Sequence, residues 1–454
     1  MDVQGKKYLI VGIARSGLAA AELLQAHGAA VLLNDGKTAD KLGRFAAGYE
    51  KFPHHLGGHP PALLDGCAGV VVSPGVPPEI PLLAEARRRS IEIIGEIELG
   101  WRFCRGSLVG ITGTNGKTTT TTLTGELLRA AGLPAVTCGN MGHPLARAAG
   151  EAAGAEKVFI CELSSFQLEG ISSMRPRVAV LLNLTPDHLD RYPGLDSYFA
   201  AKGHIYDYQA ADDWTVVNCA DARARALAET SRARRIYIGA GADAFPWSVY
   251  PGEGEVRWRR DGREEPILPV AEIGIPGPHN LENAMAAAAV ALAYGVPAAQ
   301  VAAVLHSFRG VEHRLEPVRE LRGVQFINDS KGTNVDAVVK SLQSYRQPIV
   351  WIGCGRDKGG DFSVLDPLVQ MHVRAVVLFG ELADTIERAL TSRPQLQRAA
   401  DMADAVRRAF ALAQPGDVVL LSPGGTSFDL YGDFEERGRV FKDAVRALAR
   451  EVGA

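Results

Sequence analysis

Cysteine is scarce in this sequence, and the cysteines are not grouped. The 454 residues include six cysteines, with no CxxC pair among them. This spacing argues against a zinc site or a disulfide scaffold, so we expect the reduced thiols of a cytoplasmic protein. Apolar runs are also short. None approaches the roughly 18 residues of a membrane span, and the opening residues lack the pattern of a signal peptide.

An excess of basic residues is missing as well. Lysine and arginine number 49 against 52 acidic residues, which gives a formal net charge of -3. A non-specific nucleic-acid binder is normally more basic, so no nucleic-acid partner is expected. The chain also lacks internal repeats and low-complexity tracts. With 46% hydrophobic and 22% charged residues, it has the composition of a globular protein, and its length predicts two or three domains.

Strand-like and helix-like segments alternate along nearly the whole chain, which is typical of α/β domains with mainly parallel sheets. We expect three such domains, at residues 1–106, 107–309 and 310–454. Short alternating segments between about residues 236 and 275 predict an antiparallel insertion. The expected strands are 8–11, 30–33, 70–73, 108–111, 158–161, 178–182, 215–217, 324–328, 349–353, 375–379 and 418–421, and the two clearest helices are 16–27 and 283–294.

A phosphate-binding loop is the strongest single motif. The residues Gly113, Thr114, Asn115, Gly116, Lys117, Thr118 and Thr119 follow an apolar strand and open a helix. Backbone N–H groups of such a turn surround phosphates, the lysine neutralises them, and the hydroxyl of Thr118 can reach Mg²⁺. Ile111 replaces the first glycine of the usual motif. The loop therefore predicts ATP binding, although not an ordinary P-loop hydrolase.

A second glycine turn, Gly12–Gly17, also follows a strand and opens a helix. It is similar to a dinucleotide fingerprint, but Ala14 replaces the middle glycine. Asp35 ends the next strand, where a carboxylate can bind a ribose hydroxyl or a base edge. A purely structural turn and an NAD-dependent dehydrogenase are the alternatives. A site for a nucleotide-linked substrate agrees best with the rest of the chain.

Two further side chains follow predicted strands, where ligands bind in α/β sheets, and a lysine stands on a later helix. Glu162 ends one predicted strand and His188 follows another, so both can converge on the metal of the phosphate loop. His188 alone is equally well explained as a histidine of a loop. Lys202 alone predicts only a solvated lysine on a helix.

Together these motifs resemble the Mur ligases of peptidoglycan precursor synthesis, and within them the branch that adds glutamate. The resemblance covers all three domains. It rests on six motifs in the expected order: Gly113–Thr118, Glu162–Glu169, Asn183–Arg191, His279–Asn283, His313–Glu316 and Asp329–Asn334. It implies a Rossmann-like N-terminal domain, a central P-loop ATPase-like domain and a C-terminal Rossmann-like domain.

The resemblance also implies roles in catalysis and in binding ATP. Lys117 and Thr118 would serve the phosphates and a first Mg²⁺, Glu162 would bind metal, and His188 would help to hold a second Mg²⁺. Lys202 occupies the position of a carbamylated lysine, whose carboxylate-like oxygens suit Mg²⁺ better than an ammonium does. Asn283 would contact adenine, Arg314 a phosphate and Asp329 the ribose.

The substrates implied are UDP-N-acetylmuramoyl-L-alanine, D-glutamate and ATP, joined through an acyl phosphate by a protein that we expect to be monomeric. The residues implied for the UDP-linked substrate are Arg15, Ser16, Asp35, Ser73, Gly75, Asn140 and Ser164. Those implied for the amino acid are Thr333, Lys358, Ser427, Phe428 and Phe434. The segment 422–428 departs mildly from the run of small residues typical of this branch.

Several alternatives stay open at this point. L-glutamate could replace D-glutamate, because the departure at 422–428 affects the amino-acid pocket. Sister ligases that add L-alanine, a diamino acid or a dipeptide, and a folylpolyglutamate synthetase, share the overall plan. A non-catalytic nucleotide-binding relative is disfavoured because Lys117, Glu162, His188 and Lys202 are all present. An amidating subunit would carry a cysteine cluster, which this sequence lacks.

Overall fold

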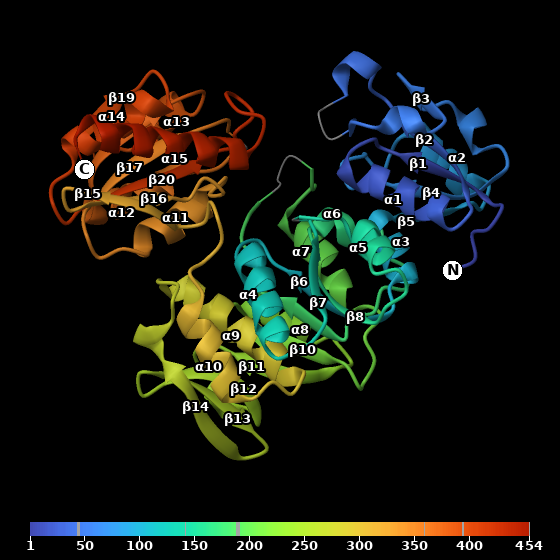
Figure 1. Cartoon of the computed structure of the whole chain (residues 1–454), viewed down its shortest axis with the longest axis horizontal. Coiled ribbons are helices and arrows are strands. Elements are labelled where there is room, and N and C mark those ends of the chain that lie inside the picture. The colour runs from blue at the N-terminus through green and yellow to red at the C-terminus, as the bar shows by residue number, and fades with distance from the viewer. Residues whose placement is uncertain (43–45, 141, 188–190, 358, 393–394, 454) are drawn as a thin grey trace. The chain divides into compact units, whose positions relative to one another are not determined.

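The computed structural model in Figure 1 describes residues 1–42, 46–140, 142–187, 191–357, 359–392 and 395–453. It contains three sheets. The N-terminal sheet consists of five parallel strands in the order β3-β2-β1-β4-β5. Their bounds are β1 (Lys7–Val11), β2 (Ala30–Asp35), β3 (His54–Leu56), β4 (Cys67–Val72) and β5 (Glu92–Gly95).

Successive side chains of β1 point to opposite faces of this sheet, and helices cover both faces. Tyr8 and Ile10 belong to a buried cluster with helix α1 (Arg15–Ala26), whereas Leu9 and Val11 pack with helix α2 (Pro81–Arg88). The chain adds β2 and β3 on one side of β1, then crosses to add β4 and β5 on the other. Such a reversal places a ligand crevice at the carboxyl ends of β1 and β4.

The central sheet has nine strands in the order β14-β13-β12-β11-β10-β9-β6-β8-β7. Strand β6 lies between β8 and β9, so its carboxyl end is again a point where the strand order reverses. The bounds are β6 (Gly106–Thr112), β7 (Ala135–Gly139), β8 (Lys157–Glu162), β9 (Val178–Leu181), β10 (Trp214–Asn218), β11 (Arg234–Ile238), β12 (Trp247–Gly252), β13 (Glu255–Arg260) and β14 (Arg263–Pro269).

The predicted antiparallel insertion is confirmed only in part. Strands β12, β13 and β14 pair antiparallel, as the alternating segments indicated. However, β11 and β12 both continue the parallel pairing from β10, so this stretch extends the central sheet instead of forming a separate one. The helix predicted from residue 283 starts earlier in the structure, where α9 covers Pro278–Ala293.

Helix α3 (Glu96–Phe103) connects the N-terminal sheet to the central one. Its fully buried Glu98 accepts the backbone N–H groups of Ser172, Ser173 and Met174, each at 3.0 Å. Arg102, one turn later, donates to the same carboxylate at 2.9 Å. A buried carboxylate with several donors is stable in its charged form. Glu98 therefore fixes the loop at residues 172–174 to the connecting helix.

The C-terminal sheet has the order β15-β16-β20-β17-β18-β19, with only the edge pair β15–β16 antiparallel. Odd and even residues of its central strands belong to two different buried clusters, so both faces are covered by helices. The bounds are β15 (Glu316–Leu321), β16 (Val324–Asn328), β17 (Ile349–Cys354), β18 (Val373–Phe379), β19 (Gln395–Arg398) and β20 (Val418–Gly424). The main helices are α11 (Val335–Gln343), α12 (Asp366–His372), α13 (Ala383–Ala389), α14 (Met402–Leu412) and α15 (Phe434–Glu451).

The chain divides into two compact units. The first contains the N-terminal and central sheets, and the second contains the C-terminal sheet together with residues 185–195 and 272–282. The three predicted domain boundaries stay a prediction, although each sheet does occupy its own stretch of sequence. Among the described helices, none is both long enough and apolar enough to cross a membrane.

Candidate active site

The phosphate loop joins the central strand β6 to helix α4 (Lys117–Ala130). Gly113 and Gly116 have positive φ angles, +147° and +84°. At Gly116 there is also no space for a side chain, because a Cβ would lie 2.2 Å from Asn283 Oδ1. Gly116 is the N-cap residue of α4, so the loop leads directly into a helix N-terminus. This arrangement is typical of an anion site.

Two lysine ammonium groups donate hydrogen bonds to the carbonyl oxygens of this loop. Lys117 Nζ donates to the carbonyls of Gly113 and Thr114, each at 2.7 Å. Lys202 Nζ, from helix α7 (Leu195–Gly203), donates to the Gly113 carbonyl at 3.0 Å. Lys202 is only 2% exposed and lies 4.7 Å from the centre of the Tyr198 ring. A buried lysine at the phosphate loop is unlike the solvated lysine that the sequence alone predicted.

The carboxylate of Glu162 lies beside the first turn of α4. Thr118 Oγ1 donates to Glu162 Oε2 at 2.8 Å, and Asn140 Nδ2 donates to Oε1 at 3.0 Å. Strands β6 and β8 are direct neighbours, which brings the end of one to the loop that follows the other. Glu162 is 1% exposed. Hydroxyl and carboxylate oxygens are the ligands that Mg²⁺ prefers, so Thr118 and Glu162 fit such an ion.

Two residues to which the sequence analysis gave no role, Asn183 and Tyr198, support the loop. Asn183, after β9, accepts the Asn115 N–H at 2.9 Å and donates to the Asn115 carbonyl at 3.1 Å. Its own carbonyl accepts the Thr114 N–H at 3.0 Å. The Tyr198 hydroxyl lies 3.2 Å from Thr114 Oγ1. The place of Asn183 at a strand end was a usable signal, whereas nothing in the sequence marks Tyr198.

Asn283, predicted to contact adenine, lies against the loop. Its Oδ1 accepts the Thr120 hydroxyl at 3.3 Å. Thr119, also predicted for ATP, is buried in the first turn of α4. The adenine contact itself stays a prediction. His188, predicted for a second Mg²⁺, lies outside the described residues.

The glycine turn after β1 is closed by Ser73 and Asp35. Ser73 Oγ donates to the Gly12 carbonyl at 2.8 Å, and Ser16 Oγ donates to Ser73 Oγ at 3.3 Å. Gly12 has a φ of +96°, and a Cβ there would lie 2.7 Å from Ser73 Cβ. Asp35 accepts the Ile13 N–H at 2.8 Å. Three residues predicted for the UDP-linked substrate thus gather at the carboxyl ends of β1, β2 and β4.

The other residues predicted for that substrate lie in different settings. Arg15 and Gly75 are exposed. Ser164 caps helix α6 (Ser165–Leu168), where its hydroxyl accepts the Gln167 N–H at 3.3 Å. Ser164 follows β8 just after Glu162, so it lies near Asn140, which bonds that carboxylate. The set therefore divides between the strand ends of the N-terminal sheet and the end of β8.

In the C-terminal sheet, Asp329 directly follows β16. Its Oδ2 accepts the hydroxyls of Ser341 at 2.6 Å and Ser422 at 3.0 Å, and Oδ1 accepts the Leu315 N–H at 3.4 Å. Burial raises the pKa of the Asp329 carboxyl, while the nearby charge of Arg314 opposes that shift. The structure therefore brings together Asp329 and Arg314, two residues predicted for ATP.

The residues predicted for the amino acid are Thr333, Lys358, Ser427, Phe428 and Phe434. Ser427 is buried, whereas Phe428 is 63% exposed. Phe434 begins α15, and its ring lies 5.1 Å from Lys331 Nζ. Lys358 lies outside the described residues.

Arg437 is a buried residue that the sequence reasoning missed. It is 0% exposed on α15 and donates to the Ser330 carbonyl at 2.8 Å, to Ser330 Oγ at 3.1 Å and to the Gly425 carbonyl at 3.1 Å. These bonds join the loops that follow β16 and β20. The sequence offers no signal for this role, because an arginine on an amphipathic helix usually faces solvent.

Three family models match successive stretches of the chain. The Mur ligase MurD-like N-terminal domain matches residues 6–95, the Mur ligase middle domain 111–291, and the Mur ligase glutamate ligase domain 313–425. The chain belongs to the Mur ligase family. It is 43% identical over 459 residues to the UDP-N-acetylmuramoylalanine–D-glutamate ligase of Geobacter metallireducens, with 99% of each chain covered. It is 40% identical over 456 residues to the protein of that name from Alkaliphilus metalliredigens, covering 99% of this chain and 100% of the relative.

Solved structures of Mur ligases share the fold. The MurF ligase of Thermotoga maritima in complex with ADP matches with a TM-score of 0.62 and 17% identity, covering 99% of this chain and 97% of that one. The UDP-N-acetylmuramate-alanine ligase MurC of Thermotoga maritima matches with a TM-score of 0.60 and 19% identity, covering 97% and 99%. The expected three-domain Mur ligase architecture is confirmed.

Proposed function

We propose that this chain is the ATP-dependent ligase that joins D-glutamate to UDP-N-acetylmuramoyl-L-alanine in peptidoglycan precursor synthesis. The observation that carries the proposal is the phosphate loop with two lysines on its carbonyls and the Thr118–Glu162 pair beside it. Relatives that carry this name match the chain from end to end at about 40% identity. We further propose a monomeric protein of the cytoplasm.

The chemistry begins with the carboxylate of the alanyl residue. Its oxygen attacks the γ-phosphorus of ATP, the bond to ADP breaks, and an acyl phosphate forms. The amine of D-glutamate then attacks the acyl carbon and inorganic phosphate leaves, so an amide bond remains. The first step brings two anions together, and the Lys117 ammonium offsets their repulsion. The protein contributes mainly positioning and charge.

Mg²⁺ fits the oxygen donors of Thr118 and Glu162. When bound, it would supply charge that stabilises the phosphate oxygens. We propose that His188 and a carbamate on Lys202 help to hold a second Mg²⁺. The burial of Lys202 beside the loop supports this role, because carbamylation would exchange a desolvated cation for an oxygen ligand.

The three substrates are assigned to three groups of residues. For ATP we propose the residues of the loop from Gly113 to Thr119 together with Asn283, Arg314 and Asp329. For the UDP-linked substrate we propose Arg15, Ser16, Asp35, Ser73, Gly75, Asn140 and Ser164. For D-glutamate we propose Thr333, Lys358, Ser427, Phe428 and Phe434. Lys358 suits the side-chain carboxylate as a point charge.

Release of inorganic phosphate from ATP tests the proposal in one assay. Release should require UDP-N-acetylmuramoyl-L-alanine and D-glutamate together, with the amide product detected by mass spectrometry. L-glutamate, L-alanine and a diamino acid serve as alternative acceptors. Turnover with one of these and not with D-glutamate would overturn the assignment of the amino acid, and ATP binding without turnover would support a non-catalytic relative.

A further inference from the structure

Arg314 is flanked by two residues in left-handed backbone conformations. His313 has a φ of +66° and Leu315 a φ of +41°. Residues other than glycine adopt this conformation at an energetic cost, so the surrounding contacts must hold it. Strained backbone of this kind is concentrated at functional sites. Side chains from neighbouring segments maintain the backbone conformation on either side of Arg314.

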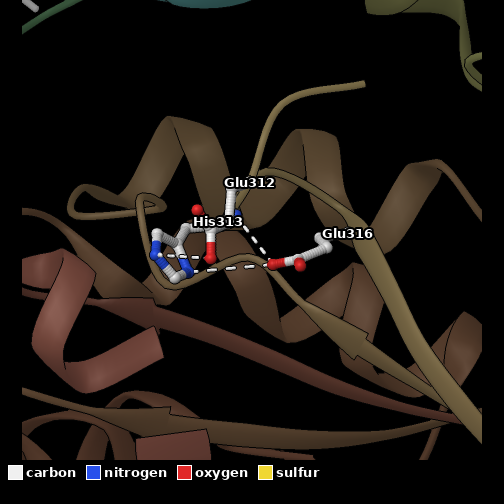
Figure 2. Close-up of side chains that lie close together, drawn as sticks. All are labelled: Glu312, His313 and Glu316. Atoms are coloured by element: carbon white, nitrogen blue, oxygen red, sulfur yellow. Dashed lines mark hydrogen bonds and ion pairs between the residues drawn. The ribbon is translucent and has the colours of Figure 1, made fainter. Parts of the chain in front are cut away.

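Glu316 provides the contact on one side. Its Oε2 accepts the His313 N–H at 2.9 Å and the Asn328 amide at 3.0 Å (Figure 2 shows the carboxylate turned toward His313). Asn328, 0% exposed at the end of β16, also places its Nδ2 2.9 Å from His313 Nδ1. On the other side, Asp329 accepts the Leu315 N–H at 3.4 Å. Polar side chains thus hold both left-handed residues: Asn328 and Asp329 are buried, and Glu316 is half-buried.

Lys442 of helix α15 holds Glu316 in turn. Its Nζ donates to Glu316 Oε1 at 3.0 Å and also to Glu312. Glu312, His313 and Glu316 together have the ligand types of a cation site. However, the Lys442 ammonium already donates hydrogen bonds to both carboxylates, so their negative charge is compensated by a side chain of the protein. The cluster is therefore better understood as a support than as a metal centre.

We infer that Glu316 and Lys442 are positioning residues for Arg314. This inference rests on the proposed function, in which Arg314 binds the ATP phosphates. Glu316 fixes the backbone before the arginine, Asp329 fixes the backbone after it, and Lys442 keeps the Glu316 carboxylate in place. The guanidinium is then held ready for charge on the phosphates, so little reorganisation is needed when ATP binds.

Steady-state kinetics of four variants test the inference. Glu316→Ala should lower kcat/KM for ATP by at least about 10-fold and Lys442→Met by about 5-fold, because each loosens the Arg314 backbone. Glu316→Gln keeps an acceptor for the His313 N–H, so it should recover most of the loss. KM for the UDP-linked substrate should change little. Arg446→Met is the matched control, because Arg446 pairs with Asp443 at 2.9 Å on the exposed side of the same helix.

The combination with Arg314→Ala separates positioning from general damage. If Glu316 acts through Arg314, Glu316→Ala should change kcat/KM by less than about 2-fold in the Arg314→Ala background. A full additional loss in that background would overturn the inference, as would wild-type kinetics in both Glu316→Ala and Lys442→Met. If Glu316→Ala does not fold, Lys442→Met and Glu316→Gln in the same cycle carry the test.

Hydrogen exchange gives a readout that needs no substrate. The His313 amide should exchange faster in Glu316→Ala and Lys442→Met than in the wild type, and at the wild-type rate in Arg446→Met. Unchanged exchange in the first two variants would overturn the inference. A wild-type enzyme without D-glutamate-dependent phosphate release would instead refute the proposed function, so the two failures can be told apart.

Discussion

The hydroxyl of Thr118 and the carboxylate of Glu162 form a hydrogen bond of 2.8 Å across 44 residues of chain. One residue begins the helix after β6 and the other ends the neighbouring strand β8. The pair is buried, so both oxygens are held in place before any ligand arrives. The contact connects the phosphate loop to the oxygen donors proposed for Mg²⁺.

Replacing Thr118 with valine should abolish most of the ligase activity. The change removes the hydroxyl with little loss of volume, and it leaves a buried carboxylate short of a donor, which costs about 1–3 kcal/mol of stability. We expect kcat to fall by at least about 100-fold. Phosphate release and thermal unfolding measure the two effects.

Thr121→Val on the same helix is the matched control for Thr118→Val. The Thr121 hydroxyl is buried and makes no hydrogen bond to any residue that the structure describes. The control should keep near wild-type activity. Equal losses in both variants would mean that the hydroxyl of Thr118 has no special role.

Asn183→Asp should raise KM for ATP. Aspartate keeps the acceptor for the Asn115 N–H but loses the donor to the Asn115 carbonyl. The free carboxylate also adds negative charge beside an anion site. We expect about a 10-fold increase in KM, with a smaller effect on KM for the UDP-linked substrate.

Asn218→Asp provides the comparison for Asn183→Asp. Asn218 ends the strand β10, where its side-chain amide donates to the Leu182 carbonyl at 2.6 Å and accepts the Ala220 N–H at 2.9 Å. This variant should lose stability without a selective change in KM for ATP. A similar rise in KM in both variants would argue against Asn183 as a loop support.

Carbon-13 NMR with labelled bicarbonate should detect a carbamate on Lys202. Lys202→Ala should remove that signal and most of the activity, because the proposed second Mg²⁺ would lose an oxygen ligand. Added short-chain carboxylic acids should restore part of the activity in Lys202→Ala. Full activity of Lys202→Ala, with no carbamate signal in the wild type, would refute this role.

Glu96→Gln should change how stability depends on pH. Burial raises the pKa of Glu96 from 4.5 to about 7, although its Oε1 accepts the Ala146 N–H at 2.7 Å. Between these pH values the folded protein keeps a proton that the unfolded chain releases, so the Glu96 contribution to the unfolding free energy falls as pH rises. This fall is complete by about pH 7, where it amounts to about 3 kcal/mol. Glu96→Gln removes this fall, which unfolding in urea from pH 5 to 8 would measure.

Glu98→Gln on the same helix should change the pH dependence of stability in the opposite direction. Burial acts to raise the pKa of Glu98, but hydrogen bonds from Ser172, Ser173 and Arg102 outweigh it and lower the pKa. Its stabilising contribution is therefore present at neutral pH and lost in acid. Glu98→Gln should destabilise the protein at pH 7. An equal pH dependence in both variants would contradict the two assignments.

The sequence determined the local features of this protein. Strand-like segments predicted the central strands of each sheet, and the order glycine, lysine, threonine after β6 predicted the phosphate loop, because these features depend on neighbouring residues and backbone geometry. It also placed Glu162 at a strand end. The six ordered motifs were sufficient to recognise the family, which the matched domains confirm.

Only the tertiary structure decided which distant residues meet. The burial of Lys202 against Gly113, the support of Asn115 by Asn183 and the connection from Lys442 through Glu316 to the Arg314 backbone each join segments far apart in the chain. Such contacts follow from strand order and helix packing, which hydrophobic patterning does not specify. A lysine has the same sequence signature whether water or a carbonyl oxygen surrounds it, so its role became visible only once the fold had placed its neighbours.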